Sequence, residues 1–222
     1  MTPLTLHELE SGWSGSGSDT VTLGMGCFWG PDARFGALHG VLRTRTGYAG
    51  GTTPNPTYRN MGDHTEMVEV DYDPNIISYA DILRHFWRNH KSDLPAYKGR
   101  QYISLLCVRG DGQAASAREV KDEMEAATGA SIKTEIIQFT NFTPAETRHQ
   151  KYYLKRHPGA LSQIDFLIED ESELMDSTFA TRLNGLVGGH VGRVELLAEI
   201  SRWPLPLHAR NELKSILSGL RW

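Results

Sequence analysis

Apolar and polar positions follow two different periods along the first two thirds of the chain. Short apolar or alternating runs predict strands, whereas apolar residues at i, i+3, i+4 spacing predict helices. The clearest helix spans 79–89, where Ile82, Leu83, Phe86 and Trp87 repeat at helical spacing. The expected strands cover 21–25, 41–46, 66–72, 101–108 and 132–139, and the other expected helices cover 31–40 and 113–128.

This order of elements, β-α-β-β-α-β-α-β, predicts a mixed fold. Its first six elements are typical of the ferredoxin-like pattern, in which helices cover one face of a largely antiparallel sheet. We therefore expect an α+β protein whose core is a ferredoxin-like two-layer α/β sandwich. Connectivity alone does not prove this arrangement.

The composition changes at both ends of this core. Residues 11–18 are rich in Gly and Ser, so 1–18 is expected to be a flexible N-terminal arm. From about Asp165 onward, three stretches carry apolar residues at helical spacing. We expect a main domain at 19–160 and a helical C-terminal extension at 161–222, in which no catalytic cluster is evident.

Composition and charge narrow the class of protein. Hydrophobic residues make up 39% and charged residues 23% of the chain, as in ordinary globular proteins. The net charge of -4 offers no general attraction to nucleic acid or to an anionic membrane, so neither is an expected partner. The N-terminus lacks the features of a secretory signal, and no apolar run could span a bilayer, so a cytoplasmic location is expected.

The densest chemical signal is GMGCFWG, at the expected junction of a strand and a helix. Cys27 lies at that junction, where unpaired backbone N–H groups stabilise a thiolate and can lower the thiol pKa. Phe28 and Trp29 beside it are expected to form a small apolar pocket. A lone cysteine is more often an inert core residue, however, and flanking aromatic residues are more often core packing. Trp29 occupies the place where a dinucleotide fingerprint needs its third glycine, which excludes that motif.

Several motifs occur in a distinctive succession along the chain. They are GCFWG at 26–30, GYAGGTTPNPTY at 47–58, GDHTE at 62–66, QY at 101–102 and HQKYYLKR at 149–156. This succession resembles that of the A-class peptide methionine sulfoxide reductases over roughly residues 19–157. The resemblance makes 19–160 an expected catalytic domain of the methionine sulfoxide reductase A type.

The resemblance implies a role for each matching residue. Cys27 would be the nucleophile that reduces methionine S-sulfoxide, and Phe28 and Trp29 would hold the sulfoxide methyl group. Glu66 would be the acid that protonates the oxygen, and Tyr58 and Tyr102 would bind that oxygen. The chemistry agrees, because a sulfoxide oxygen leaves poorly unless it is protonated. By itself, however, a glutamate at a strand start is usually a solvated carboxylate.

The chain departs from the family pattern in how the enzyme would be regenerated. Attack by Cys27 leaves a sulfenic acid, which another thiol must reduce. No cysteine follows Cys107, and Cys107 lies in the apolar run ISLLCVR, where a packed core residue is expected. We therefore expect no cofactor and direct reduction by an external thiol, such as thioredoxin, glutaredoxin or a small thiol.

Two further departures concern the neighbourhood of the site. Asp32 stands where the family commonly has glutamate, and it is expected to cap or pair locally. Tyr97 stands where the family places an aspartate before Tyr102, and Asp93 is a weak candidate to replace it.

Other functions remain open at this stage. A non-catalytic module could recognise oxidised methionine and signal to a partner through the C-terminal helices, but intact Cys27 and Glu66 argue against it. An acyl transferase would need a general base beside the thiol, and no histidine is close to Cys27 in sequence. His85 and His90 are five residues apart and therefore do not share a helix face, so no metal site is expected. His149 is expected to be a structural hydrogen-bonding residue.

Overall fold

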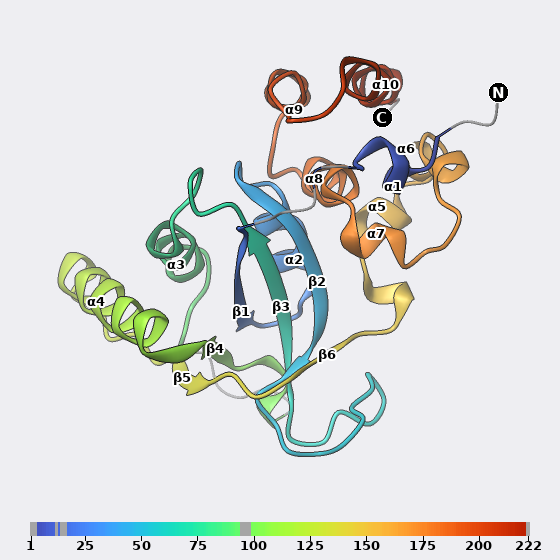
Figure 1. Ribbon diagram of the computed structural model, residues 1–222. Helices are drawn as coiled ribbons and strands as arrows, with labels where there is room; N and C mark the ends of the chain where they lie inside the picture. The colour runs from blue at the N-terminus through green and yellow to red at the C-terminus, as the bar shows by residue number, and fades with distance from the viewer. Residues whose placement is uncertain (1–3, 12, 14–16, 94–98, 221–222) are drawn as a thin grey trace.

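The computed structural model describes residues 4–11, 13, 17–93 and 99–220 (Figure 1). Within this part of the chain, a strongly curled sheet of six strands is surrounded by helices, so the protein is of the mixed α/β class. The strand order is β5-β4-β1-β3-β2-β6, and every neighbouring pair is antiparallel except β4 and β5. The strands are β1 (Asp19–Met25), β2 (Val41–Ala49), β3 (Thr65–Tyr72), β4 (Ser104–Val108), β5 (Glu135–Gln138) and β6 (Phe142–Pro144).

The helices fall into a set near the sheet and a set formed by the two ends of the chain. The first set is α2 (Trp29–Gly36), α3 (Tyr79–Arg88) and α4 (Gly110–Thr128). The second set is α1 (Leu6–Leu9), α5 (Tyr152–Arg156), α6 (Pro158–Leu161), α7 (Glu173–Asp176), α8 (Thr178–Val187), α9 (Arg193–Ile200) and α10 (Leu207–Gly219). Short 3-10 turns occupy Gly99–Tyr102, Thr147–His149 and Asp165–Leu167.

Most elements expected from the periodicity are confirmed, with local differences. Ser78 caps α3 by accepting a hydrogen bond from the Asp81 N–H, and Gly129 ends α4 in the left-handed conformation. The expected strand 101–108 begins only at Ser104, because Gly99–Tyr102 forms a 3-10 turn. The short edge strand β6 was not expected from the sequence.

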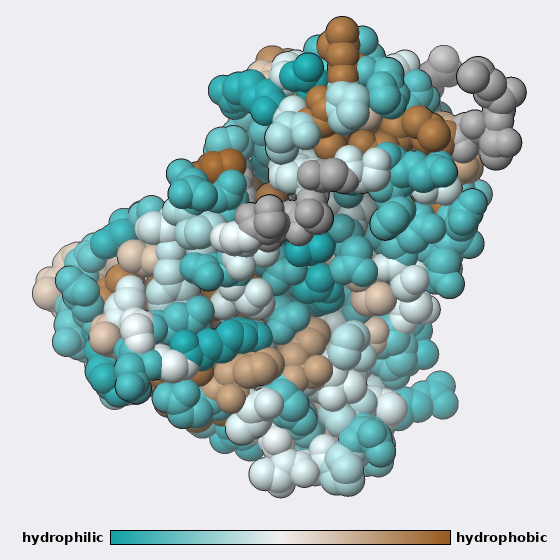
Figure 2. Space-filling model, in the orientation of Figure 1, coloured by the Kyte–Doolittle hydropathy of each residue, from teal (hydrophilic) through white to brown (hydrophobic). Residues whose placement is uncertain are grey.

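One face of the sheet packs against α2, α3 and α4 through the main hydrophobic core. This core joins apolar side chains of the central strands to those of the three helices: Val21, Leu23, Phe35, Val68, Val70, Ile82, Leu83, Phe86, Leu106, Val108, Ala117 and Val120. The other face carries a smaller cluster that includes Met67, Leu105 and Cys107. Figure 2 shows one face of the molecule, on which hydrophobic residues form small groups between hydrophilic ones.

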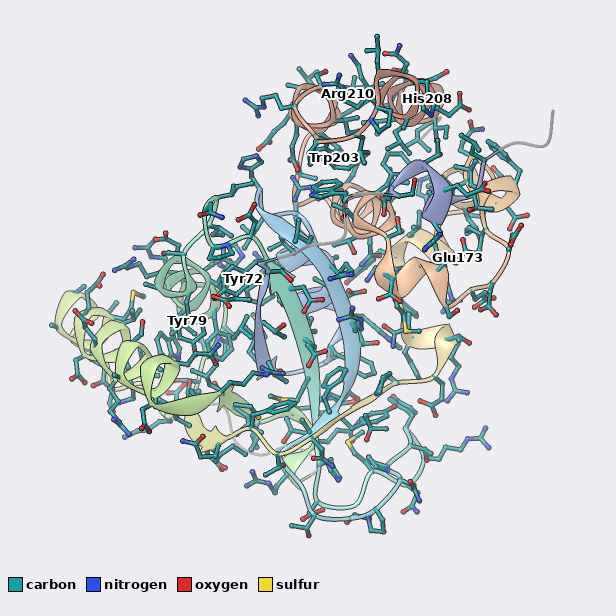
Figure 3. All side chains as sticks on the ribbon, viewed as in Figure 1. Tyr72, Tyr79, Glu173, Trp203, His208 and Arg210 are labelled. Carbon is teal, nitrogen blue, oxygen red and sulfur yellow. The ribbon has the colours of Figure 1, made fainter. Side chains whose placement is uncertain are left out.

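The C-terminal helices form a second hydrophobic core, and the N-terminus belongs to it. Leu6 and Leu9 of α1 are buried in this core, and the Trp13 ring lies 4.8 Å from that of Trp203. Trp203 lies among α8, α9 and α10 (Figure 3). Within residues 1–18, which were expected to form a flexible arm, Leu6–Leu9 form a helical turn with both leucines buried.

The sheet register brings the functional motifs to one end of the central strands. Met25 at the end of β1 pairs with Ser104 at the start of β4, so Cys27 follows β1 where Tyr102 precedes β4. Glu66 at the start of β3 pairs with Tyr48 near the end of β2. Segments far apart in sequence thus meet at this end of the sheet.

Candidate active site

Cys27 lies between the end of β1 and the first turn of α2. The residue as a whole is exposed to solvent. Partial burial of its thiol nevertheless raises the thiol pKa. The neighbouring Glu66 raises the thiol pKa further, while a hydrogen bond from the backbone N–H of Trp29 lowers it. The expectation that the helix start lowers the pKa below its ordinary value is therefore wrong for the resting thiol, because burial and the adjacent carboxylate outweigh the helix N–H.

Glu66 is fully buried, and its two carboxyl oxygens have different partners. Oε2 accepts a hydrogen bond from the backbone N–H of Phe28 at 3.1 Å, and Oε1 accepts one from Nε2 of Gln101 at 2.8 Å. The first bond fixes the carboxyl against the residue that follows Cys27. A buried carboxyl beside a thiol can donate a proton to a bound substrate or accept one from it.

Two tyrosines complete this side of the site. The hydroxyl group of Tyr102 lies near that of Tyr58, and it accepts a hydrogen bond from Nε2 of Gln101 at 2.9 Å. Loss of solvent and the nearby Glu66 raise the pKa of Tyr102, so its phenol stays protonated and can donate. Gln101 therefore links Tyr102 to Glu66 through its single amide group.

Aromatic rings form the wall beside the thiol. Phe28 is buried, and its ring centroid lies 5.4 Å from that of His149 and 6.1 Å from that of Tyr48. Trp29 is partly exposed and stacks on Tyr152, with ring centroids 3.7 Å apart and an interplanar angle of 6°. A small apolar group could bind against this wall.

His149 packs into the wall from the HQKYY segment. Its Nδ1 accepts a hydrogen bond from Trp29 Nε1 at 3.2 Å, and its ring lies 4.6 Å from that of Tyr58. Burial and Arg148 lower the pKa of His149, so the ring is neutral at pH 7 and acts as an acceptor. The expected hydrogen-bonding role of His149 is confirmed.

Sequence reasoning missed two residues behind the wall. Glu146 accepts a hydrogen bond from the hydroxyl of Tyr48 at 2.7 Å and another from the backbone N–H of Tyr58 at 3.2 Å. Tyr48 lies inside the GYAGG run, so its position in that motif was the available signal. Glu146 had no comparable signal, because its partners come from two other segments.

Asp32 does not pair locally as expected. It is fully buried in α2 and forms an ion pair with Lys151 at 3.3 Å, across 119 residues of sequence. It also accepts hydrogen bonds from Thr44 and Asn184. The Asp32 carboxylate therefore joins α2 to the HQKYY segment and to α8, both of which are distant from it in sequence and pack against α2.

The sequence raised two residues near Tyr102 in connection with the substrate pocket. Tyr97 lies outside the described residues, and Asp93 is exposed.

Cys107 is buried in the middle of β4, and burial raises its pKa to about 12. It pairs with Thr22, whereas Met25 lies about 10 Å further along β1 and Cys27 lies beyond Met25. Cys107 belongs to the small cluster on the far face of the sheet, while Phe28 belongs to the main core. A disulfide needs Cα atoms within about 7 Å, so this arrangement disfavours a bond between the two cysteines.

Among the described residues, no group of three or more His, Cys, Asp or Glu side chains is arranged to hold a metal ion. In the same part of the chain, no helix has the length and apolar character needed to cross a bilayer.

Comparison with known proteins gives consistent matches. The profile of the family described as peptide methionine sulfoxide reductase matches residues 19–182. A peptide methionine sulfoxide reductase of Drosophila melanogaster is 46% identical over 177 residues, which cover 79% of this chain and 70% of the relative. Peptide methionine sulfoxide reductase A5 of Arabidopsis thaliana is 41% identical over 171 residues, covering 75% of this chain and 66% of the relative.

A solved structure agrees with these sequence matches. Methionine sulfoxide reductase A of Corynebacterium diphtheriae superimposes with a TM-score of 0.59 at 32% identity, covering 70% of this chain and 83% of the other. The motifs at Cys27, Glu66 and His149 all fall inside the residues that the family profile matches. The chain therefore belongs to the peptide methionine sulfoxide reductase family.

Proposed function

We propose that this protein reduces methionine S-sulfoxide, free or in peptides, to methionine by means of Cys27. One observation carries the proposal. The Cys27 thiol lies beside the buried carboxyl of Glu66, which accepts a hydrogen bond from the backbone N–H of Phe28. Gln101 in turn joins this carboxyl to the phenol of Tyr102, and Tyr58 lies next to that phenol. Family membership gives the same reaction class.

In the proposed first step, the sulfur of Cys27 attacks the sulfoxide sulfur. A bond forms between the two sulfur atoms while the oxygen takes a proton from Glu66. The resulting hydroxyl group then transfers to the cysteine sulfur as the sulfur–sulfur bond and the original sulfur–oxygen bond break. The proton that Glu66 donates is the one given up by the thiol, so that overall thiol and sulfoxide give a cysteine sulfenic acid and a thioether. Phe28 and Trp29 would hold the methyl group, which fits the apolar wall that they form with His149.

Glu66 and the two tyrosines would lower the barrier of this step. A protonated Glu66 would deliver its proton to the oxygen as negative charge develops there, and the phenols of Tyr58 and Tyr102 would donate hydrogen bonds to it. Glu66 would first take this proton from the Cys27 thiol. Its carboxylate then becomes neutral, which removes the negative charge that raises the pKa of Cys27.

We propose that an external thiol regenerates the enzyme. One thiol attacks the sulfenic acid and releases water, and a second thiol then reduces the mixed disulfide to restore Cys27 and give an external disulfide. Thioredoxin, glutaredoxin or a small thiol could supply both equivalents, and no cofactor is required. The burial of Cys107 on the far face of the sheet supports this scheme. A cytoplasmic location, where thiols stay reduced, suits such a cycle.

We also propose a division of the chain. The order β4-β1-β3-β2 within the sheet, with antiparallel pairing throughout, supports a ferredoxin-like core in a catalytic domain at 19–160. The hydrophobic core of α8, α9 and α10 supports a helical C-terminal extension at 161–222.

The test is turnover of each methionine sulfoxide epimer with dithiothreitol, by the intact protein and by Cys27→Ser. The proposal expects reduction of the S epimer by the intact protein and none by the variant. Binding of the sulfoxide without turnover by the intact protein would favour a non-catalytic binding module instead. Loss of activity in Cys107→Ala but not in Cys27→Ser would reassign the nucleophile.

A further inference from the structure

α8 packs directly against α2, the helix that follows Cys27. Two glycines allow this close approach. A Cβ added at Gly185 would lie 2.8 Å from the backbone of Ala37, and one added at Gly36 would lie 2.7 Å from the carbonyl oxygen of Thr181. The two helices therefore meet backbone to backbone, and a side chain at either glycine would force them apart.

Side chains of α8 satisfy polar groups at both ends of α2. Arg182 donates from Nη1 to the carbonyl oxygen of Gly36, which lies at the C-terminal end of α2, and Arg182 is paired with Glu199. Asn184 donates from Nδ2 to Oδ2 of Asp32 at 3.0 Å, in the first turn of α2. Both contacts are buried, so water cannot replace them.

Asn184 occupies a junction between three segments. Its Oδ1 accepts a hydrogen bond from the backbone N–H of Leu154 at 3.0 Å, just after the segment that carries His149. Asp32, Lys151 and Asn184 are each 0% exposed. Lys151 donates to Asp32 from both its backbone N–H and its Nζ, and its own backbone has a positive φ of 49°. Such a conformation in a residue other than glycine persists only where its surroundings hold it.

This junction is connected to the thiol through one helical turn. The backbone N–H of Asp32 donates to the carbonyl oxygen of Phe28 at 2.9 Å. Phe28 directly follows Cys27, and its own backbone N–H donates to Oε2 of Glu66 at 3.1 Å. A displacement of Asp32 would therefore move Phe28, and with it both the adjoining Cys27 and the bond that holds Glu66 beside the thiol.

We infer that Asn184 is a positioning residue for the nucleophile, so that α8, although it lies in the proposed C-terminal extension, supports the active site of the catalytic domain. Asn184 lies beyond residues 19–182, which the family profile matches. Through Asp32 it sets the first turn of α2 against Cys27, and through Leu154 it sets the segment that packs on Trp29. The inference rests on the proposed role of Cys27 as nucleophile.

The test compares Asn184→Ala with Leu183→Ala, a buried apolar change in the same helix. The first readout is the rate of alkylation of Cys27 by iodoacetamide as a function of pH, which needs no sulfoxide. The second readout is kcat for the S-sulfoxide with dithiothreitol. Asn184→Ala should raise the pH midpoint of alkylation and lower kcat by about tenfold to a hundredfold, the usual effect of misplacing a reacting group. Leu183→Ala should lower thermal stability and leave both readouts near those of the intact protein.

An isosteric variant covers the case in which Asn184→Ala does not fold. Asn184→Asp can donate to Asp32 only while the two carboxyls share a proton, so its rate of alkylation relative to the intact protein should fall as the pH rises. A ratio that is constant with pH in Asn184→Asp would overturn the inference. So would an alkylation profile of Asn184→Ala that matches that of Leu183→Ala. Absence of sulfoxide turnover in the intact protein would defeat the proposed function, whereas the alkylation readout would still decide the inference.

Discussion

The indole Nε1 of Trp29 donates a hydrogen bond to Nδ1 of His149 at 3.2 Å. The two residues are separated by 120 positions in the sequence, and the bond holds the indole against a neutral imidazole. One face of the Trp29 ring system is covered by Tyr152, which stacks on it. This arrangement orients the wall that would hold the sulfoxide methyl group.

Trp29→Phe should weaken substrate binding more than it slows the reaction. The variant keeps an aromatic ring but loses the donor to His149, so the ring loses its fixed orientation. We expect KM for the S-sulfoxide to rise about fivefold to tenfold, in line with the loss of one net hydrogen bond, with a smaller change in kcat. Trp203→Phe, in the helical core, is the matched control. Equal KM values for the two variants would contradict the role of Trp29.

Glu66→Gln should move two properties of the site in opposite directions. Loss of the acid should lower kcat for sulfoxide reduction by about 10²- to 10⁴-fold. Loss of the negative charge should lower the pKa of Cys27, because Glu66 raises it in the intact protein. Alkylation of Cys27 by iodoacetamide at pH 7 should therefore become faster as reduction becomes slower. Slower alkylation in this variant would show that Glu66 does not act on the thiol as described.

Glu10 should make stability depend on pH. Burial raises the pKa of Glu10 from 4.5 to about 7, although its carboxyl accepts hydrogen bonds from Ser177, Thr178 and Phe179 at the start of α8. A raised pKa in the folded state contributes stability that is fully present below pH 4.5 and is lost as the pH rises to about 7.

Glu10→Gln stays neutral throughout, so its stability relative to the intact protein should increase over that pH range by up to about 3 kcal/mol. Urea unfolding at pH 5 and at pH 8 measures this difference. Glu8→Gln, an exposed change in α1 two residues before Glu10, controls for the loss of one negative charge. A difference that is constant or decreases with pH would show that the hydrogen bonds outweigh burial.

Lys151→Met should destabilise the protein strongly. The change leaves the buried carboxylate of Asp32 without its ion-pair partner, and breaking such a pair costs about 3–5 kcal/mol. Lys155→Met is the control, because the partner of Lys155 is the exposed Glu171 and such pairs contribute about 1 kcal/mol or less. Similar unfolding free energies for the two variants would mean that Thr44 and Asn184 alone satisfy Asp32.

The parts of the fold that were predictable from sequence are those set by local periodicity. The helix Tyr79–Arg88 and the strand Thr65–Tyr72 follow directly from the spacing of their apolar residues. The 3-10 turn before β4 and the edge strand β6 were missed, because only their neighbours in the sheet define where pairing begins.

The candidate site likewise contains residues that the sequence could predict and residues that it could not. Cys27 and Glu66 lie in compact motifs, and the fold brings them into contact. The partners of Asp32 and Glu146 come from segments distant in sequence, so no local spacing could predict them. The pKa of Cys27 was expected to be lowered, because the helix start beside it is visible in the sequence. The Glu66 carboxylate that helps to raise this pKa reaches the thiol only through the packing of β3, which the sequence does not show.

The most direct test of the account is mass spectrometry of the protein after one turnover with the S-sulfoxide, in the absence of any reducing thiol. The account predicts one added oxygen on the peptide that contains Cys27, trapped as a sulfenic acid adduct, and an unmodified Cys107. Cys107→Ala should give the same product and the same rate with dithiothreitol. A peptide in which Cys27 is linked to Cys107 as the main product, or oxygen transfer that survives in Cys27→Ser, would contradict it.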